Sequence, residues 1–201
     1  KFFVKKWQGK GKERQDDKTF WEDLLEDVFG VEKARDIIEV QKTVKFQGST
    51  KAIDIYIKPS KVVIEQKSRG VSLDKKEEQS DKTMLSPFDQ AQRYYNWLDQ
   101  PEQGRYIVTC NFEEFRIFDN FNKRKEQVVI KLDELPKRWK QLAFLTETYL
   151  QKEEQEKHER LVASKASEFV RLLYKELRKD NKGKDKSVLH TLNVFCVRVV
   201  F

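Results

Sequence analysis

The stretch KAIDIYIKPSKVVIEQKSRG, residues 51–70, indicates two apolar strands joined by a tight turn at residues 59–60. Pro and Ser are typical of such turns, and the flanking Ile and Val residues favour strands. Three charged residues interrupt the apolar pattern: Asp54, Glu65 and Lys67. Charges are costly inside a sheet unless they are paired, so their placement requires a chemical explanation.

Alternation along a strand places Glu65 and Lys67 on one face. Folding the hairpin about its turn puts residue 56 opposite residue 63 and Asp54 opposite Glu65, with β-carbons about 5 Å apart. Two carboxylates at that separation repel each other, and a divalent cation would compensate them. We therefore expect Mg²⁺, with Mn²⁺ as a substitute, to bind at Asp54 and Glu65. A register shifted by one residue would turn the opposite face of the strand to this side.

The other face of the first strand is expected to be apolar. Asp54 shares its face with Tyr56, which leaves Ile53, Ile55 and Ile57 on the opposite face.

An acid pair that holds Mg²⁺ can orient and deprotonate a water molecule and neutralise charge on a phosphodiester. A lysine beside the metal can stabilise the charge of the transition state. The pattern therefore predicts metal-dependent phosphodiester chemistry on the face that carries Asp54.

The chain is expected to hold three parts. Residues 1–18 are polar and basic, with five Lys within the first 12 residues, and are predicted to form a flexible arm. Residues 19–136 predict an α/β domain with a mixed central sheet flanked by helices. Residues 137–201 predict an α-helical connector.

Periodicity places the elements of the central domain. A helix is expected from Thr19 to Gly30, followed by a strand that ends at Gly48. Residues 68–85 are too polar to pack and predict a long loop, and long loops inside compact domains are more often functional than idle. Ser86 and Pro87 predict the start of a second helix that runs to about residue 98. Further strands are expected in GRYIVTC (104–110), FRIFDN (115–120) and QVVIKLDEL (127–135).

Charge and hydropathy restrict the partners. The net charge is +7, and locally basic patches on a nearly balanced body suit a polyanion such as DNA. There is no run of 18 apolar residues, so we expect no membrane span, and a cytoplasmic location in a bacterial cell is expected. Because the chain starts at Lys1 and ends within an apolar run, we interpret it as part of a longer protein.

The segments IDIYI and VVIEQKSRG resemble the motif of the PD-(D/E)xK nucleases, with Ile53 where the first Pro of that motif would stand. In DQAQRYYNWL, Gln90 and Tyr94 form the Q-x-x-x-Y of the RecB-like branch. Five ordered blocks are similar to single-chain type II restriction–modification enzymes, in which an N-terminal nuclease is fused to an adenine methyltransferase. These blocks are FWEDLLEDVFG, IEQKSRGVSL, SPFDQAQRYYNWL, YIVTCNFEEFRIFD and LHTLNVFCVRVVF.

The resemblance implies a restriction-endonuclease-like core and a Mg²⁺-dependent endonuclease that acts on double-stranded DNA. Asp54 and Glu65 would bind the metal together with the backbone carbonyl of Gln66, and Lys67 would assist catalysis. S-adenosylmethionine would bind only in a methyltransferase domain downstream, since these residues contain no N-P-P-Y motif. Cleavage of both strands would need two nuclease copies, as in a transient nuclease dimer, or two binding events.

Several residues are candidates for supporting roles. In related nucleases an acid from the first helix or the first strand completes the metal site, which would be Glu22 or Glu39 here. Gln90 would orient substrate or metal-bound water, and Tyr94 would either help or serve as a core aromatic residue. The loop residues Ser68, Arg69 and Lys82 would contact DNA phosphates or simply be solvated.

Other readings remain open. A RecB-like nuclease that acts on DNA ends or junctions would carry the same motif. A catalytically inactive nuclease fold could serve as a DNA-binding module, although retention of Asp54, Glu65 and Lys67 argues against it. The last alternative is an unrelated α/β domain with a chance match.

Overall fold

The computed structural model describes residues 1–122, 124, 126–180, 187, 189–191, 194–195 and 198. Contacts divide the chain into two units, Lys1–Leu150 and Gln151–Phe201. The first unit is an α/β domain built on a mixed six-stranded sheet in the order β1-β2-β3-β6-β7-β8. The strands are β1 (Ile38–Phe46), β2 (Ser49–Ile57), β3 (Val62–Gln66), β6 (Tyr106–Cys110), β7 (Glu114–Asp119) and β8 (Val128–Lys131). All neighbouring strands are antiparallel except β3 and β6, so the predicted mixed sheet is confirmed.

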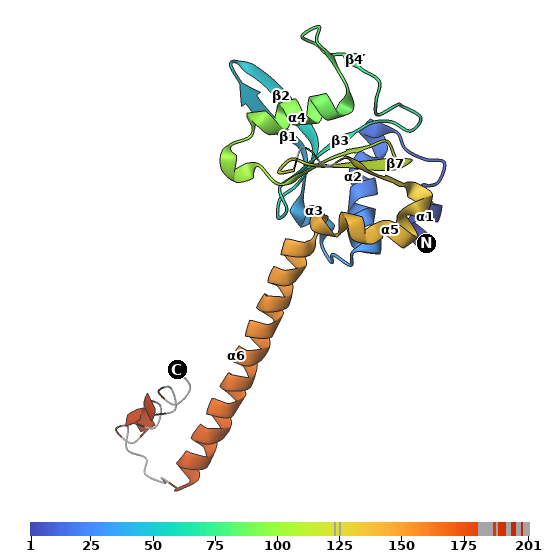
Figure 1. Cartoon of the computed structure of the whole chain (residues 1–201). Helices are drawn as coiled ribbons and strands as arrows, with labels where there is room; N and C mark the ends of the chain where they lie inside the picture. Colours follow the sequence, from blue (N-terminus) through green and yellow to red (C-terminus); the bar gives the residue numbers. More distant parts are fainter. Residues whose placement is uncertain are drawn as a thin grey trace. The chain divides into compact units, whose positions relative to one another are not determined.

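Helices cover both faces of the sheet (Figure 1). Helix α4 (Pro87–Trp97) lies on one face and packs Ala91, Tyr94 and Tyr95 against Val63 and Ile107. The opposite face is covered by the apolar side chains of α1 (Phe2–Trp7), α2 (Glu13–Asp23), η1 (Leu24–Val28), α3 (Ala34–Ile37) and α5 (Leu135–Arg138). Short 3₁₀ segments, η2 (Gln100–Glu102), η3 (Leu132–Glu134) and η4 (Trp139–Leu145), connect the elements.

The amino-terminal residues are not a flexible arm. They form α1 and the first turns of α2, and the predicted first helix therefore starts at Glu13 rather than at Thr19. Phe3 and Trp7 are buried in the core, where Trp7 lies against Phe20 and Phe112. Phe3 and Trp7 are four residues apart and therefore share one helix face, while the lysines between them occupy the exposed face.

The β1–β2 hairpin follows regular pairing except at one position. Its ladder skips the pair Gln41 and Asp54, and Gln41 has a φ of 53°. Alternation breaks there: Ile55 and Ile57 belong to the core on the α2 side, whereas Ile53 packs with the residues below α4. The expectation that all three isoleucines share a face was wrong for Ile53, because the irregular pair shifts the alternation of β2 by one residue.

The long polar segment of residues 68–85 is confirmed as mostly irregular. It contains only the two-residue strands β4 (Glu77–Glu78) and β5 (Met84–Leu85). Helix α4 then starts as predicted, with Ser86 as the N-cap and Pro87 at the first helical position. In this capping box, the Ser86 side chain accepts from the backbone N–H of Asp89 (3.2 Å), and the Asp89 side chain accepts from the backbone N–H of Ser86 (3.1 Å).

The helical connector starts later than expected. Residues 137–150 belong to the first unit, because Leu142 and Leu145 are fully buried in its core. Helix α6 (Glu147–Asp180) supplies most of the described part of the second unit. Of the helix expected near the carboxyl end, residues 187, 189–191, 194–195 and 198 are helical, and the rest lies outside the described residues. Among the described residues, no helix is long and apolar enough to cross a membrane.

Candidate active site

The two acidic residues of the motif meet where β2 and β3 separate. The ladder has the predicted register, with Tyr56 opposite Val63, and it ends at the pair Ile55 and Ile64. Asp54 and Glu65 follow this last pair, so they lie at the open end of the ladder. Instead of a main-chain bond between the strands, Asp54 Oδ2 accepts from the backbone N–H of Gln66 (2.9 Å). Gln41 Nε2 donates to the other carboxylate oxygen, Oδ1, over 3.2 Å.

A chain of polar contacts links β3 to α4. Lys67 Nζ donates to Glu65 Oε1 (2.7 Å) and to Gln90 Oε1 (3.3 Å). Gln90 Nε2 in turn lies 3.4 Å from the hydroxyl oxygen of Tyr94. Gln90 and Tyr94 are four residues apart and therefore share a face of the helix. The structure thus brings five of the predicted residues together: Asp54, Glu65, Lys67, Gln90 and Tyr94.

Burial gives this cluster unusual electrostatics. The side chain of Glu65 is only 1% exposed, and burial together with the charge of Asp54 raises its pKa well above the usual value, against the opposing effect of Lys67. Burial also raises the pKa of Asp54, although the Gln66 N–H and Lys67 lower it. Burial alone would lower the pKa of Lys67, but the charge and hydrogen bond of Glu65 raise it overall. Two carboxylates thus compete for one ammonium group, which leaves the cluster short of positive charge.

Sequence reasoning missed a third acid beside the cluster. Glu13 is the first residue of α2, and its backbone N–H donates to Ser68 Oγ (3.2 Å). Burial raises the pKa of Glu13, Lys67 lowers it, and Asp54 raises it further, so its carboxylate lies within the electrostatic reach of both residues. It was overlooked because residues 1–18 were assigned to a flexible arm. The signal was available: an apolar spacing of four at Phe3 and Trp7 predicts that this segment is folded.

The partly buried Asp17 also lies near the cluster. Its charge contributes to the raised pKa of Asp54, and burial raises its own pKa. Asp17 is four residues after Glu13 in α2, so both carboxylates share one helix face. Helix α2 therefore supplies two acids, and neither of them is the predicted Glu22.

The two predicted auxiliary acids are engaged elsewhere. Glu22 pairs with Lys18 over 3.8 Å on the surface of α2. Glu39 pairs with Lys42 (3.3 Å), and Lys42 also contacts Glu102 (2.9 Å). The described contacts bring neither acid to Asp54 or Glu65.

The predicted residues that flank the acid cluster in sequence lie in different surroundings. Ser68 contacts the start of α2, as described above, and Arg69 forms an ion pair with Glu113 (3.0 Å). Lys82 is exposed in the loop between β4 and β5, and its φ of 64° lies in the left-handed region. The predicted contact of Lys82 with DNA phosphate stays a prediction. The side chain of Gln66 points away from the cluster, since its Oε1 accepts from Trp21 Nε1 (2.9 Å) in the core. Only the main chain of Gln66 is therefore near Asp54.

An unpaired hydroxyl lies next to Glu65. Thr109 is the partner of Glu65 in the parallel pair β3–β6, and it is 1% exposed. Its Oγ1 is buried and has no hydrogen-bond partner in the part of the chain that the structure describes. A buried hydroxyl without a partner is costly, so a further oxygen atom, such as a water molecule, fits this position.

The cluster fits a hard divalent cation. Within the described residues, no three His, Cys, Asp or Glu side chains converge closely enough to hold a metal ion by themselves. Mg²⁺ does not require such a cage, because it uses one or two carboxylates and keeps several water or phosphate oxygens. Asp54, Glu65 and the backbone carbonyl of Gln66 offer such oxygen donors, and the orphaned hydroxyl of Thr109 could receive a hydrogen bond from a bound water molecule. The excess negative charge of the site would be offset by the cation.

Comparison with known proteins places the chain in a family. Residues 1–180 match the family model described as the N-terminal domain of MmeI. No curated protein and no solved structure matches the chain. The match includes α1 and α2, which agrees with their place in the folded domain.

Proposed function

Because this chain belongs to the family of MmeI N-terminal domains, and MmeI is a type II restriction–modification enzyme, we propose that it is a metal-dependent endonuclease domain that hydrolyses phosphodiester bonds of double-stranded DNA. The observation that supports this most is the joint placement of Asp54, Glu65, Lys67 and Gln90 at the open end of the β2–β3 ladder. Packing alone would not maintain two carboxylates in a buried site with one counter-charge.

The residues have distinct roles in this proposal. Asp54 and Glu65, with the Gln66 backbone carbonyl, would hold Mg²⁺ or Mn²⁺. When bound, such a cation lowers the pKa of water and neutralises charge on the phosphate. Lys67 would place its ammonium beside the phosphate oxygen on which negative charge develops. Gln90 contacts Lys67 over 3.3 Å and would hold that ammonium in position.

We expect hydrolysis by displacement at phosphorus. The oxygen of a water molecule bonds to phosphorus while one bridging P–O bond breaks, a basic group takes up the water proton, and the leaving sugar oxygen receives a proton from solvent. Glu65 is suited to share in this proton transfer, because burial and the charge of Asp54 raise its pKa well above the usual glutamate value and so make the carboxylate a better proton acceptor. Each acid or base of this type typically contributes about 10²- to 10⁴-fold in rate.

The proposal is tested by single-turnover cleavage of plasmid DNA in Mg²⁺, with Asp54→Ala and Glu65→Ala as site variants. Glu102→Ala is the matched control, since it removes an acid that pairs with Lys42 away from the cluster. We expect cleavage to be lost in the site variants and kept in the control, and Mg²⁺ to raise the melting temperature of the wild type and of Glu102→Ala but not of the site variants. Cleavage that survives both site substitutions would place the nuclease outside this site.

The same experiment separates the alternatives. Preference for DNA ends over closed circles would favour a RecB-like enzyme that acts on ends or junctions. Metal-independent DNA binding without any cleavage would favour an inactive DNA-binding module. S-adenosylmethionine is not expected to bind these residues, and calorimetric titration of the chain would test that. Analytical ultracentrifugation with DNA would test the proposed transient nuclease dimer.

A further inference from the structure

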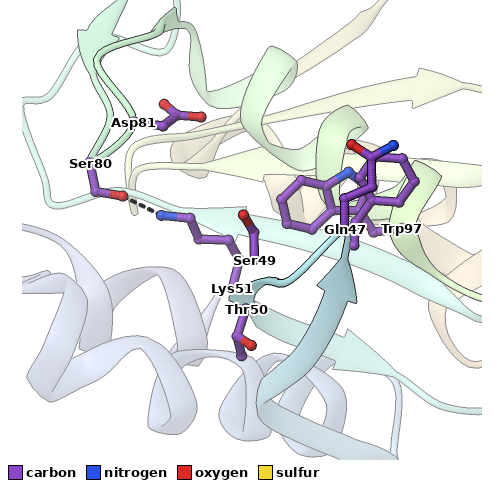
Figure 2. A pocket seen from close by; sticks show the side chains of 8 residues that line it. Gln47, Ser49, Thr50, Lys51, Ser80, Asp81 and Trp97 are labelled. Atoms are coloured by element: carbon purple, nitrogen blue, oxygen red, sulfur yellow. Dashed lines mark hydrogen bonds between the residues drawn. The ribbon is translucent and has the colours of Figure 1, made fainter.

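A pocket lies along the α4 side of the sheet, separate from the acid cluster. It has a volume of about 380 Å³ and is formed by the tip of the β1–β2 hairpin, the loop at Ser80 and Asp81, and the end of α4 at Trp97 (Figure 2). Cavities of this size are typical of small-ligand or single-residue subsites. No residue of the cluster at Asp54 and Glu65 lines it.

Two aromatic rings form one wall of the pocket. Phe46 and Trp97 are stacked, with ring centroids 5.6 Å apart and planes inclined by 18°. Phe46 is nevertheless 47% exposed. Trp97 also contacts Tyr94, with centroids 5.9 Å apart, so the exposed ring rests on a fixed support. The result is a flat apolar surface that faces solvent.

The opposite wall carries positive charge and hydroxyl groups. Lys51 Nζ donates to Ser80 Oγ across the pocket, as Figure 2 shows. Asp81 also lines the pocket, but its carboxylate is paired with Arg93 (2.7 Å). The hairpin itself contains no Asp or Glu between Glu39 and Asp54, in a chain that has 34 acidic residues. The hairpin tip is therefore locally basic.

The pocket lies at a defined spacing from the acid cluster. Lys51 precedes Asp54 by three residues of β2, which corresponds to about 10 Å along a strand. Trp97 follows Gln90 by seven residues of α4, which is also about 10 Å along a helix. Both routes therefore place the pocket about 10 Å from the cluster, close enough for one bound DNA molecule to reach both.

We propose that this pocket is a second DNA subsite, which holds a nucleotide near the phosphate at the acid cluster. Lys51 and Ser80 bind a phosphate oxygen, and the exposed ring of Phe46 contacts the flat face of a base or sugar. Proteins that bind nucleic acid combine basic groups with aromatic stacking surfaces in this manner. The inference rests on the proposed function, since it extends the DNA path of the same site. The nucleotide could belong to a paired or an unpaired strand, since both offer a phosphate oxygen and a flat base or sugar.

The experiment measures DNA binding without divalent cations, by fluorescence anisotropy at several salt concentrations. The probes are a blunt duplex, a duplex with a single-stranded overhang, and a single strand. We expect Phe46→Ala to weaken binding about tenfold, because stacking is lost, without changing the salt dependence. Lys51→Ala should weaken binding and reduce the slope of log affinity against log salt by about 0.7–0.9, the value for one phosphate contact. The probe that shows the larger effect identifies the strand as paired or unpaired.

Lys45→Ala is the matched control. Lys45 is exposed on the same hairpin tip, but its neighbours Val44 and Phe46 face α4, so Lys45 points to the other side of the sheet. We expect wild-type binding from it, and melting curves of all three variants show that they are folded. Wild-type affinity of Phe46→Ala and Lys51→Ala for all probes, an equal loss in Lys45→Ala, or no binding by the wild type would overturn the inference.

Failure of this inference can be distinguished from failure of the proposed function. Cleavage that requires Asp54, together with unchanged binding by the pocket variants, would remove the subsite and leave the proposed function. Binding that depends on Phe46 and Lys51, in a protein that never cleaves DNA, would support the subsite and contradict the proposed nuclease function.

Discussion

Lys67 connects the acid pair to helix α4, because its ammonium contacts Glu65 (2.7 Å) and Gln90 (3.3 Å). If Lys67 only balances the carboxylates, Lys67→Met should cost stability and leave substantial cleavage. If it stabilises charge in the transition state, the variant should fold and bind metal and DNA but cleave about 10²- to 10³-fold more slowly. We expect the second result in single-turnover cleavage, because Lys67 contacts Glu65 at the open end of the β2–β3 ladder, where the phosphate would bind.

Lys42→Met is the control for this substitution. Lys42 is equally enclosed, with 13% side-chain exposure, and also contacts two partners, Glu39 and Glu102, but it lies outside the acid cluster. Its replacement should reduce stability without slowing cleavage per folded molecule. Equal cleavage rates for the two methionine variants would refute a transition-state role of Lys67.

Glu65 should make stability depend on pH. Its folded-state pKa is raised, so its contribution is fully present below the ordinary glutamate value of about 4.5 and is lost as pH rises through the folded pKa. The free energy of unfolding of the wild type should therefore fall with rising pH in this window, relative to Glu65→Gln. Urea unfolding between pH 4 and pH 8, in steps of about one pH unit, would measure the difference in free energy of unfolding between the wild type and Glu65→Gln.

A divalent cation should reverse that loss of stability in the wild type but not in Glu65→Gln, since it binds the ionised carboxylates. At about 100 times its Kd, a ligand that binds the folded state stabilises it by about 2.7 kcal/mol. Glu26→Gln, the same change at an exposed position, should follow the wild type at every pH. If the free energy of unfolding of the wild type and of Glu65→Gln changed in parallel with pH, the raised pKa of the buried Glu65 carboxylate would be contradicted.

At the scale of elements, the capping box at the start of α4 positions Gln90. The backbone N–H of Gln90 donates to the carbonyl of Ser86 (2.9 Å), so the first turn is part of the site. Ser86→Ala should lower the free energy of unfolding by about 1 kcal/mol and also reduce cleavage, because a frayed turn loosens the contact between Gln90 and Lys67. Ser86→Thr keeps a capping hydroxyl and should restore both properties; a comparable loss in both variants would exclude the cap as the cause.

At the scale of the whole domain, the amino-terminal helix is part of the core. Trp7 is 5% exposed, packs on Phe20 and Phe112, and donates from Nε1 to Asp23 (2.8 Å). Trp7→Ala should therefore lower the free energy of unfolding by about 3–5 kcal/mol in chemical denaturation. Lys5→Ala, on the exposed face of the same helix, should have almost no effect. A flexible arm would instead tolerate both substitutions equally.

Local patterns were sufficient for much of the site. The turn at residues 59–60 determines the hairpin register, and alternation then places Glu65 and Lys67 on one face. The spacing of four between Gln90 and Tyr94 places both on one helix face, and the Ser-Pro sequence predicts the start of that helix. Each of these relations depends on backbone geometry over a few residues, which is why the sequence alone determined them.

Tertiary packing decided the rest. Glu13 approaches Lys67 only because α2 packs its aromatic face, Phe20 and Trp21, beneath the sheet. The shift of Ile53 to the α4 side depends on the irregular position at Gln41 and Asp54, where the β1–β2 ladder skips a pair, and alternation cannot predict it. The stacking of Phe46 on Trp97 joins residues that are 51 positions apart in the chain. Such contacts follow from the free energy of burying surfaces that are distant in sequence, and no local period encodes them.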